Sequence, residues 1–156
     1  MAVDMEFNVA IESVDQIELS EPLCCEPQES LRGVLAKLKQ HNNGTALICR
    51  EGVLVGIFTE RDALKLLTRC ADFDRPIENF MTRAPVSMRP EASIGAAIRK
   101  MAAGGYRRLP IVDREGVPIG VLHTAAIVRF MVEHFPKTIY NLPPVPHAVM
   151  QQREGS

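Results

Sequence analysis

The residues with the clearest chemical potential are a hydroxyl and an acid at the start of a predicted helix. Thr59 and Asp62 are three residues apart, and the helix is expected over residues 60–69. This spacing is close to a capping box, in which the threonine side chain accepts from an early helix N–H and the acid accepts from the backbone N–H of the threonine. A helix N-terminus also offers unsatisfied N–H groups and a positive dipole end, so a phosphate can be held beside Thr59. The two roles are compatible.

Two adjacent arginines form a second group with binding chemistry. Arg107 and Arg108 follow a Gly-Gly pair and precede a predicted strand. Arginines in such a place are usually solvated or paired with nearby acids, here Asp113 or Glu115. The glycine pair can simply end the preceding helix through a left-handed cap. The local sequence therefore leaves both a structural and an anion-binding interpretation open.

These residues lie in a sequence that repeats itself. A shift of 63 positions, which becomes 64 after one extra residue in the second copy, aligns the following segments: Val14-Asp15-Gln16-Ile17 with Ile77-Glu78-Asn79-Phe80, Pro27-x-x-Ser30-Leu31 with Pro90-x-x-Ser93-Ile94, and Gly52-Val53-x-x-Gly56 with Gly116-Val117-x-x-Gly120. A repeat of this length is one supersecondary unit that cannot bury its apolar face alone. The two copies are therefore expected to pack about a pseudo-twofold axis, which creates two related clefts.

Each copy is predicted to contain a strand, a helix, two strands and a second helix, which gives an α/β (α+β) fold class. Apolar residues at helical spacing predict the first helices over residues 30–41 and 93–103, with Ser30 and Ser93 as N-caps. Strand-like runs around short turns predict hairpins at 45–59 and 109–123, each followed by a helix, at 60–69 and 124–134. The predicted divisions are a lead-in (1–13), a first repeat (14–70), a linker (71–76), a second repeat (77–135) and a Pro-rich tail (136–156).

Composition restricts the possible classes of function. The chain has 156 residues and is 46% hydrophobic, enough for one well-buried domain or two half-domains that share a core. A net charge of -1 provides no overall field for nucleic acid or an anionic membrane surface. The sequence contains neither an apolar run of about 20 residues nor a signal peptide at its N-terminus. We therefore expect a cytoplasmic protein with no membrane insertion and no nucleic-acid partner.

The four cysteines do not form a metal or redox motif. Cys24, Cys25, Cys49 and Cys70 show no Cys-x-x-Cys spacing, so a structural zinc and a redox pair are not predicted. Free cysteine packs as a small hydrophobe. Reduced thiols are therefore expected, with Cys24, Cys25 and Cys49 in the core.

The combination of the repeat with two short motifs resembles the CBS domain, named after cystathionine beta-synthase. The motifs are Gly56-Ile57-Phe58-Thr59-Glu60-Arg61-Asp62 and Tyr106-Arg107-Arg108-Leu109-Pro110-Ile111-Val112-Asp113. The resemblance covers residues 14 to about 135. It implies a tandem, or Bateman module, in which each repeat has a small three-stranded sheet and two helices and the two sheets pack together. It also implies that two such modules pair into a four-repeat disc, hence a homodimer.

The resemblance further implies an adenosine-containing ligand in a cleft between the repeats. In the family, the acid of the first motif holds the ribose hydroxyls, and the threonine region and basic residues of the opposing repeat hold phosphate. Carried onto this sequence, the ligand-binding residues are Thr59, Glu60 and Asp62 from the first repeat and Tyr106, Arg107, Arg108 and Pro110 from the second. No catalytic residue and no metal ligand is implied.

A comparison of the two copies favours binding at one cleft. Thr59 and Asp62 correspond to His123 and Ala126, and Arg107 and Arg108 correspond to Gly44 and Thr45. In the family, each cleft takes its acid from one repeat and its basic residues from the other. One cleft of this chain therefore keeps both the acid and the arginines, and the second cleft lacks both. Independent capping boxes and surface arginines would not have to sort in this way. We expect one adenine-nucleotide site per chain, for AMP, ADP or ATP, that switches an unidentified partner protein without catalysis.

Several alternatives stay open. S-adenosylmethionine is a less favoured ligand, because two arginines suit phosphate better than a sulfonium. The chain could instead be a ligand-free scaffold for dimerisation. An enzyme is disfavoured because the histidines lie in no recognisable catalytic motif. His123 could contact phosphate or cap a helix, and we favour the cap. The Pro-rich tail suits a mobile extension and a strap over a partner chain equally.

Overall fold

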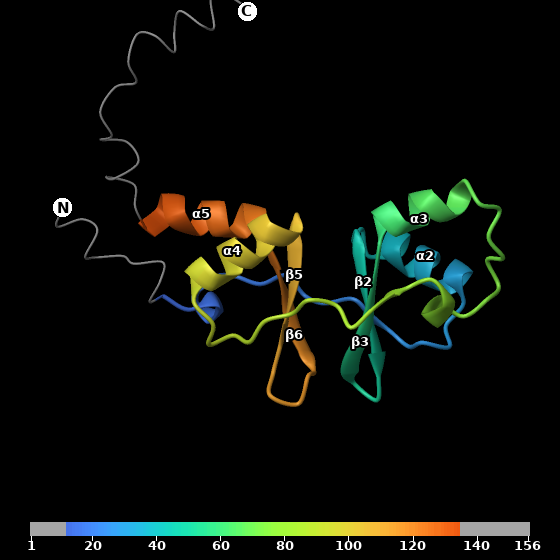
Figure 1. The fold of residues 1–156 in the computed structure, drawn as a ribbon, viewed down its shortest axis with the longest axis horizontal. Helices are drawn as coiled ribbons and strands as arrows, with labels where there is room; N and C mark the ends of the chain where they lie inside the picture. The colour runs from blue at the N-terminus through green and yellow to red at the C-terminus, as the bar shows by residue number, and fades with distance from the viewer. Residues whose placement is uncertain (1–11, 135–156) are drawn as a thin grey trace, which may run out of the picture.

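The two repeats lie side by side, with their sheets facing each other at the centre and their helices toward the outside (Figure 1). This computed structural model describes residues 12–134. Leu47, Cys49 and Val121 pack between the sheets, and each repeat also has its own core between sheet and helices. The predicted α/β fold class and the tandem arrangement are confirmed.

The first repeat is built as the periodicity predicts. Its elements in chain order are β1 (Cys24–Cys25), α2 (Leu31–Gln40), β2 (Thr45–Arg50), β3 (Val53–Thr59) and α3 (Glu60–Leu67). Strands β2 and β3 form the antiparallel hairpin, and β1 pairs in parallel with β2. The apolar stripe of α2, which includes Leu31, Val34 and Leu38, is buried against this sheet.

The second repeat copies this plan with α4 (Ile94–Gly104), β5 (Arg108–Val112), β6 (Pro118–His123) and α5 (Thr124–His134). The side chains of Ser30 and Ser93 accept hydrogen bonds of 3.0 Å from the N–H groups of Gly33 and Ala96. The predicted N-caps of the first helix in each repeat are thus confirmed. The extra residue of the second copy is accommodated in the turn of its hairpin, between β5 and β6.

The segment that begins each repeat folds onto the other repeat. The short helix η1 (Val14–Gln16) is bound to the second repeat, where the N–H of Val14 donates to the carbonyl of Ala92 at 2.8 Å. In the same way η2 (Ile77–Asn79) is bound to the first repeat through Ile77 N–H and the carbonyl of Glu29 at 2.7 Å. These exchanged segments tie the halves together, so each cleft is bordered by a crossing chain.

The number of strands differs from the three predicted in each repeat. In the first sheet the crossing segment adds β4 (Thr82–Arg83), giving the order β1-β2-β3-β4. In the second, only β5 and β6 form a ladder, and the equivalents of β1 and β4 are isolated bridges at Met88 and Ser20. Such short pairings carry no alternating pattern, so the sequence did not distinguish a strand from a single bridge.

The prediction of buried cysteines is right for Cys25 and Cys49 and wrong for Cys24, which is exposed. All four cysteines are free thiols. A hydrogen bond with the Cys49 side chain lowers the pKa of the Cys24 thiol to about 7 and raises that of Cys49, to which burial also contributes. Cys24 lies on the short edge strand β1, whose two residues alternate between exposed and buried.

Within residues 12–134, every helix is too short or too polar to cross a membrane. The cytoplasmic location inferred from the sequence stays a prediction. The Pro-rich tail and most of the lead-in fall outside the described residues, so both roles expected for the tail stay predictions.

Candidate functional site

A cavity of about 750 Å³ lies between the two repeats. This volume is within the range of small-molecule sites in proteins. Both repeats and the chain that crosses between them line it: Thr45, Ile57, Thr59, Glu60, Arg61, Asp62, Thr82, Ala84, Pro85, Val86, Gly105, Tyr106, Arg107, Arg108, Leu109 and Pro110. All seven residues predicted from the sequence to bind a ligand are among them.

Thr59 and Asp62 form the capping box that their spacing predicts. One carboxylate oxygen of Asp62, Oδ2, accepts from the Thr59 N–H at 2.9 Å and from the Thr59 hydroxyl at 3.1 Å. The Asp62 N–H in turn donates to Thr59 Oγ1 at 3.3 Å. These bonds fix the carboxylate at the cavity wall while engaging only Oδ2. The acid can therefore accept hydroxyl groups of a ligand, mainly through Oδ1, without giving up its structural role.

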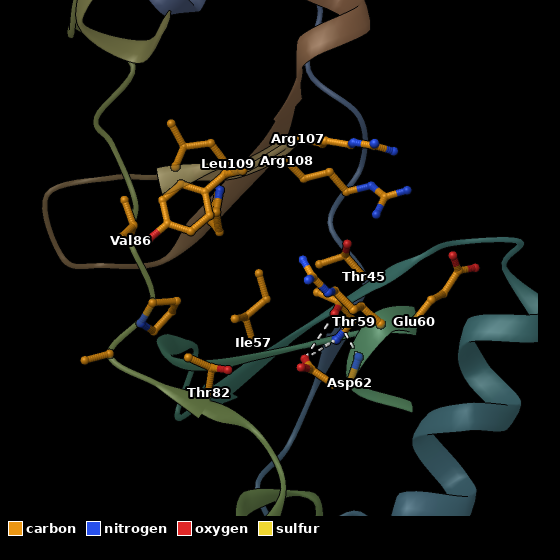
Figure 2. A pocket seen from close by; sticks show the side chains of 16 residues that line it. Thr45, Ile57, Thr59, Glu60, Asp62, Thr82, Val86, Arg107, Arg108 and Leu109 are labelled. Carbon is orange, nitrogen blue, oxygen red and sulfur yellow. Dashed lines mark hydrogen bonds between the residues drawn. The ribbon is translucent and has the colours of Figure 1, made fainter. Parts of the chain in front are cut away.

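The two arginines stand across the cavity from this acid (Figure 2). Helix α4 is capped at its C-terminus by Gly105, whose φ of 69° is left-handed and suits glycine, and the chain then turns into β5. The carbonyl of Arg107 accepts from the N–H of Thr124 at 3.1 Å, which holds the start of β5 against α5. Arg107 is exposed and Arg108 half-buried, and neither side chain has an ion pair among residues 12–134.

Arg108 reaches back to the first repeat over a residue with no side chain. A Cβ built on Gly44 would lie 2.8 Å from a terminal guanidinium nitrogen of Arg108, closer than real Cβ contacts. Gly44 is the position that the sequence comparison matched to Arg107. The difference between the copies thus has a steric consequence, because the small residue of one repeat makes room for the arginine of the other.

The opposite side of the cavity is apolar. Ile57, Val86 and Leu109 form this wall (Figure 2). The chain that borders the cavity bends at Ala84, whose φ of 47° is unusual for a residue with a Cβ. Sequence reasoning did not assign ligand contacts to the crossing residues 82–86, because neither CBS motif of the sequence includes them.

The sequence model of the CBS domain matches this chain twice, at residues 14–69 and 77–133. The chain belongs to the CBS domain family. Among curated relatives, the CBS domain-containing protein YhcV of Bacillus subtilis is 34% identical over 97 residues, which cover 62% of this chain and 69% of that protein. An uncharacterised 17.7 kDa protein of Acidianus ambivalens is 26% identical over 121 residues, or 77% of this chain and 73% of that one.

Solved CBS domain pairs share the fold. The pair of protein MJ0100, in complex with 5′-methylthioadenosine and S-adenosyl-L-methionine, is 25% identical with a TM-score of 0.69 and covers 79% of this chain and 98% of its own. The CBS domain protein PAE2072 of Pyrobaculum aerophilum, complexed with AMP, is 19% identical with a TM-score of 0.67. The match covers 77% of this chain and 98% of that one. At that identity the second likeness shows the fold alone.

The second cleft of this CBS pair differs from the first in size and chemistry. Its cavity is about 330 Å³ and is lined by Glu18, Leu19, Ser20, His123, Ala125, Ala126 and Arg129. The acid of the first cleft is replaced here by Ala126, which is buried. The two clefts of the module are therefore not equivalent, as the comparison of the copies indicated.

His123 takes the place of Thr59 in this second cleft. Its Nε2 lies 2.9 Å from the hydroxyl of Ser20 on the crossing segment. Burial and the neighbouring Arg108, its partner on the β5–β6 ladder, lower the pKa of His123. This contact with Ser20 joins the crossing segment to β6, and the helix-capping role that we favoured from the sequence stays a prediction. Among the described residues there is no cluster of three or more acids, histidines or cysteines that could hold a metal ion.

Proposed function

We propose that this protein is a regulatory module that binds an adenine nucleotide, AMP, ADP or ATP, in the larger cleft between its two CBS repeats. The observation that carries the proposal is the placement of Asp62 from one repeat and Arg107 and Arg108 from the other on one cavity. The complexes of related CBS pairs with AMP and with S-adenosyl-L-methionine support an adenosine-containing ligand.

The chemistry of the cavity suits the three parts of a nucleotide. The Asp62 carboxylate accepts the ribose hydroxyls, and charge-assisted bonds of this kind contribute about 1.5–3 kcal/mol each. Arg107 and Arg108 bind phosphate oxygens, for which a planar guanidinium has matching donors. The apolar wall of Ile57, Val86 and Leu109 covers the base. Tyr106, Glu60 and Pro110 complete the proposed contacts.

The binding event acts as a switch and not as a catalytic step. A ligand that touches both repeats stabilises the relative orientation in which both halves of the site reach it. It shifts the population of conformations only by its difference in affinity for them. A partner protein that recognises one orientation then responds to the concentration of the ligand.

A thermal-shift panel tests the proposal directly. A ligand that binds only the native state stabilises it by about 2.7 kcal/mol at a hundred times its Kd, which corresponds to a rise in melting temperature of roughly 5–10 °C. We expect this rise with AMP, ADP or ATP. A rise with S-adenosylmethionine alone would replace the nucleotide by that ligand. No rise with any of the four compounds would favour the ligand-free scaffold.

We also propose that the protein is a homodimer that pairs through one helix of each repeat. Leu64 and Leu67 of α3 are 65% and 61% exposed, and Val128 and Val132 of α5 are 61% and 37% exposed. Helices α3 and α5 lie at the same side of the molecule (Figure 1). Two modules that meet through this side would cover all four side chains and form a four-repeat disc.

The double variant Leu64→Glu, Val128→Glu is therefore expected to sediment as a monomer while the wild type sediments as a dimer. Charges placed in an apolar interface remain unpaired and desolvated, which opposes association. The matched control is Val53→Glu, a 38% exposed apolar residue on β3, which should leave the dimer intact. A wild type that is monomeric at all concentrations would refute the homodimer.

A further inference from the structure

One polar group at the cavity has no hydrogen-bond partner in the protein. Thr45, the first residue of β2, is 3% exposed and is the one buried polar residue within residues 12–134. Its Oγ1 is covered from solvent and forms no hydrogen bond. A buried hydroxyl without a partner is unfavourable, and such groups in native proteins usually mark a function or a missing partner.

The position of Thr45 shows where a partner would come from. It is the direct ladder neighbour of Thr59, and both residues line the cavity. In Figure 2 Thr45 lies between the Arg107–Arg108 pair and the Thr59–Asp62 capping box. By the same ladder geometry it is the counterpart of Arg108, which opens β5 and pairs with His123. Thr45 and Arg108 thus occupy equivalent positions in the two repeats, and both line the same cavity, one with a hydroxyl and the other with a guanidinium.

We propose that the Thr45 hydroxyl is a phosphate-binding group of this cleft and that the nucleotide supplies the hydrogen bond that the free protein lacks. The inference rests on the proposed nucleotide site and adds a residue that neither CBS motif of the sequence contains. A hydroxyl beside two donor-only guanidinium groups is best used as a further donor, because a phosphate oxygen accepts several hydrogen bonds at once.

Access to the hydroxyl involves Arg108. The guanidinium of Arg108 lies against Gly44, the residue next to Thr45. A phosphate that draws this flexible side chain toward itself moves it off the backbone beside Thr45 and leaves room for the hydroxyl to reach the same phosphate. Arginine and threonine then bind as one unit, with the arginine positioned in the free protein by the absence of a side chain at residue 44.

The test compares two substitutions at this position in the full chain. Thr45→Val keeps the shape and removes the hydroxyl. We expect it to melt about 2–5 °C above the wild type without ligand, since the unpaired group is gone, and to bind AMP about tenfold more weakly by calorimetry. Thr45→Ser keeps the hydroxyl and loses a buried methyl group. It should melt below the wild type and keep its affinity for AMP within about a factor of three.

Adenosine, which has no phosphate, separates the two parts of the ligand. Thr45→Val should bind adenosine as the wild type does. An equal loss for adenosine and AMP would place the hydroxyl on the nucleoside and overturn the phosphate assignment, and unchanged AMP affinity would overturn the inference altogether. A Thr45→Val protein less stable than the wild type would show that the hydroxyl has a partner within the protein. Failure of the wild type to bind any nucleotide is a different result, because it removes the proposed function together with this inference.

Discussion

Asp62→Ala is expected to weaken AMP binding by more than tenfold. The carboxylate is held at the cavity wall by two hydrogen bonds from Thr59, and its Oδ1 is left for a ligand. Loss of charge-assisted bonds to the ribose hydroxyls removes about 1.5–3 kcal/mol each, and one such bond already corresponds to a factor of ten or more. Isothermal titration calorimetry of AMP, and of adenosine, against wild type and variant measures the effect. Because the contact is to the ribose, both ligands should lose affinity to the same degree.

The capping role of Asp62 must be separated from its role in binding. Its removal also opens the capping box of α3, which costs about 1 kcal/mol of stability. Ser30→Ala removes a cap of the same kind from α2, where the serine accepts from the Gly33 N–H away from the cavity. This control should lose similar stability in denaturant unfolding and keep its affinity for AMP. Equal losses of affinity in both variants would mean that Asp62 acts only through the stability of the fold, and unchanged affinity of Asp62→Ala would refute its assignment to the ribose.

The sequence predicted those parts of the structure that depend on regular patterns. Helices expected over residues 93–103 and 124–134 are found at Ile94–Gly104 and Thr124–His134. Apolar residues at helical spacing are visible in both sequences, and Ser93 marks the N-cap of the first. The exchange of segments between the repeats was not predicted. It depends on single backbone bonds, such as that from Val14 N–H to the Ala92 carbonyl, which leave no period in the sequence.

The candidate site shows the same division. Asp62 and Arg108 were visible because the two copies could be compared. The second repeat lacks the acid that the first repeat has, and the first repeat lacks the arginines that the second repeat has. Thr45 was visible only as the counterpart of Arg108, since nothing in its local sequence says that its hydroxyl is buried and unpaired. That property depends on how the chain packs around β2, so it belongs to the tertiary structure.

The double variant Arg107→Gln, Arg108→Gln is expected to lose about a hundredfold in affinity for AMP and little for adenosine. Two charge-assisted contacts to phosphate would contribute up to about 6 kcal/mol, and exposure of Arg107 reduces this to roughly half. The affinity of the wild type for AMP should fall as salt is raised, because screening weakens an exposed charge pair, and that dependence should be smaller in the variant. Calorimetry with both ligands at two salt concentrations gives all of these values.

A matched change of charge shows whether the effect is local. Arg114→Gln removes a positive charge from the exposed turn between β5 and β6, outside the cavity, and should leave AMP affinity within about a factor of two. If Arg114→Gln weakened AMP binding as much as Arg107→Gln or Arg108→Gln alone, the arginines would act only through the net charge of the protein.

The single variants Arg107→Gln and Arg108→Gln are also expected to differ from each other. Arg108 is half-buried over Gly44, whereas Arg107 is exposed, so Arg108→Gln should account for most of the loss. The opposite ranking would place the phosphate at the rim of the cleft and away from Thr45, so this ranking also decides whether the hydroxyl and the guanidinium serve the same group of the ligand.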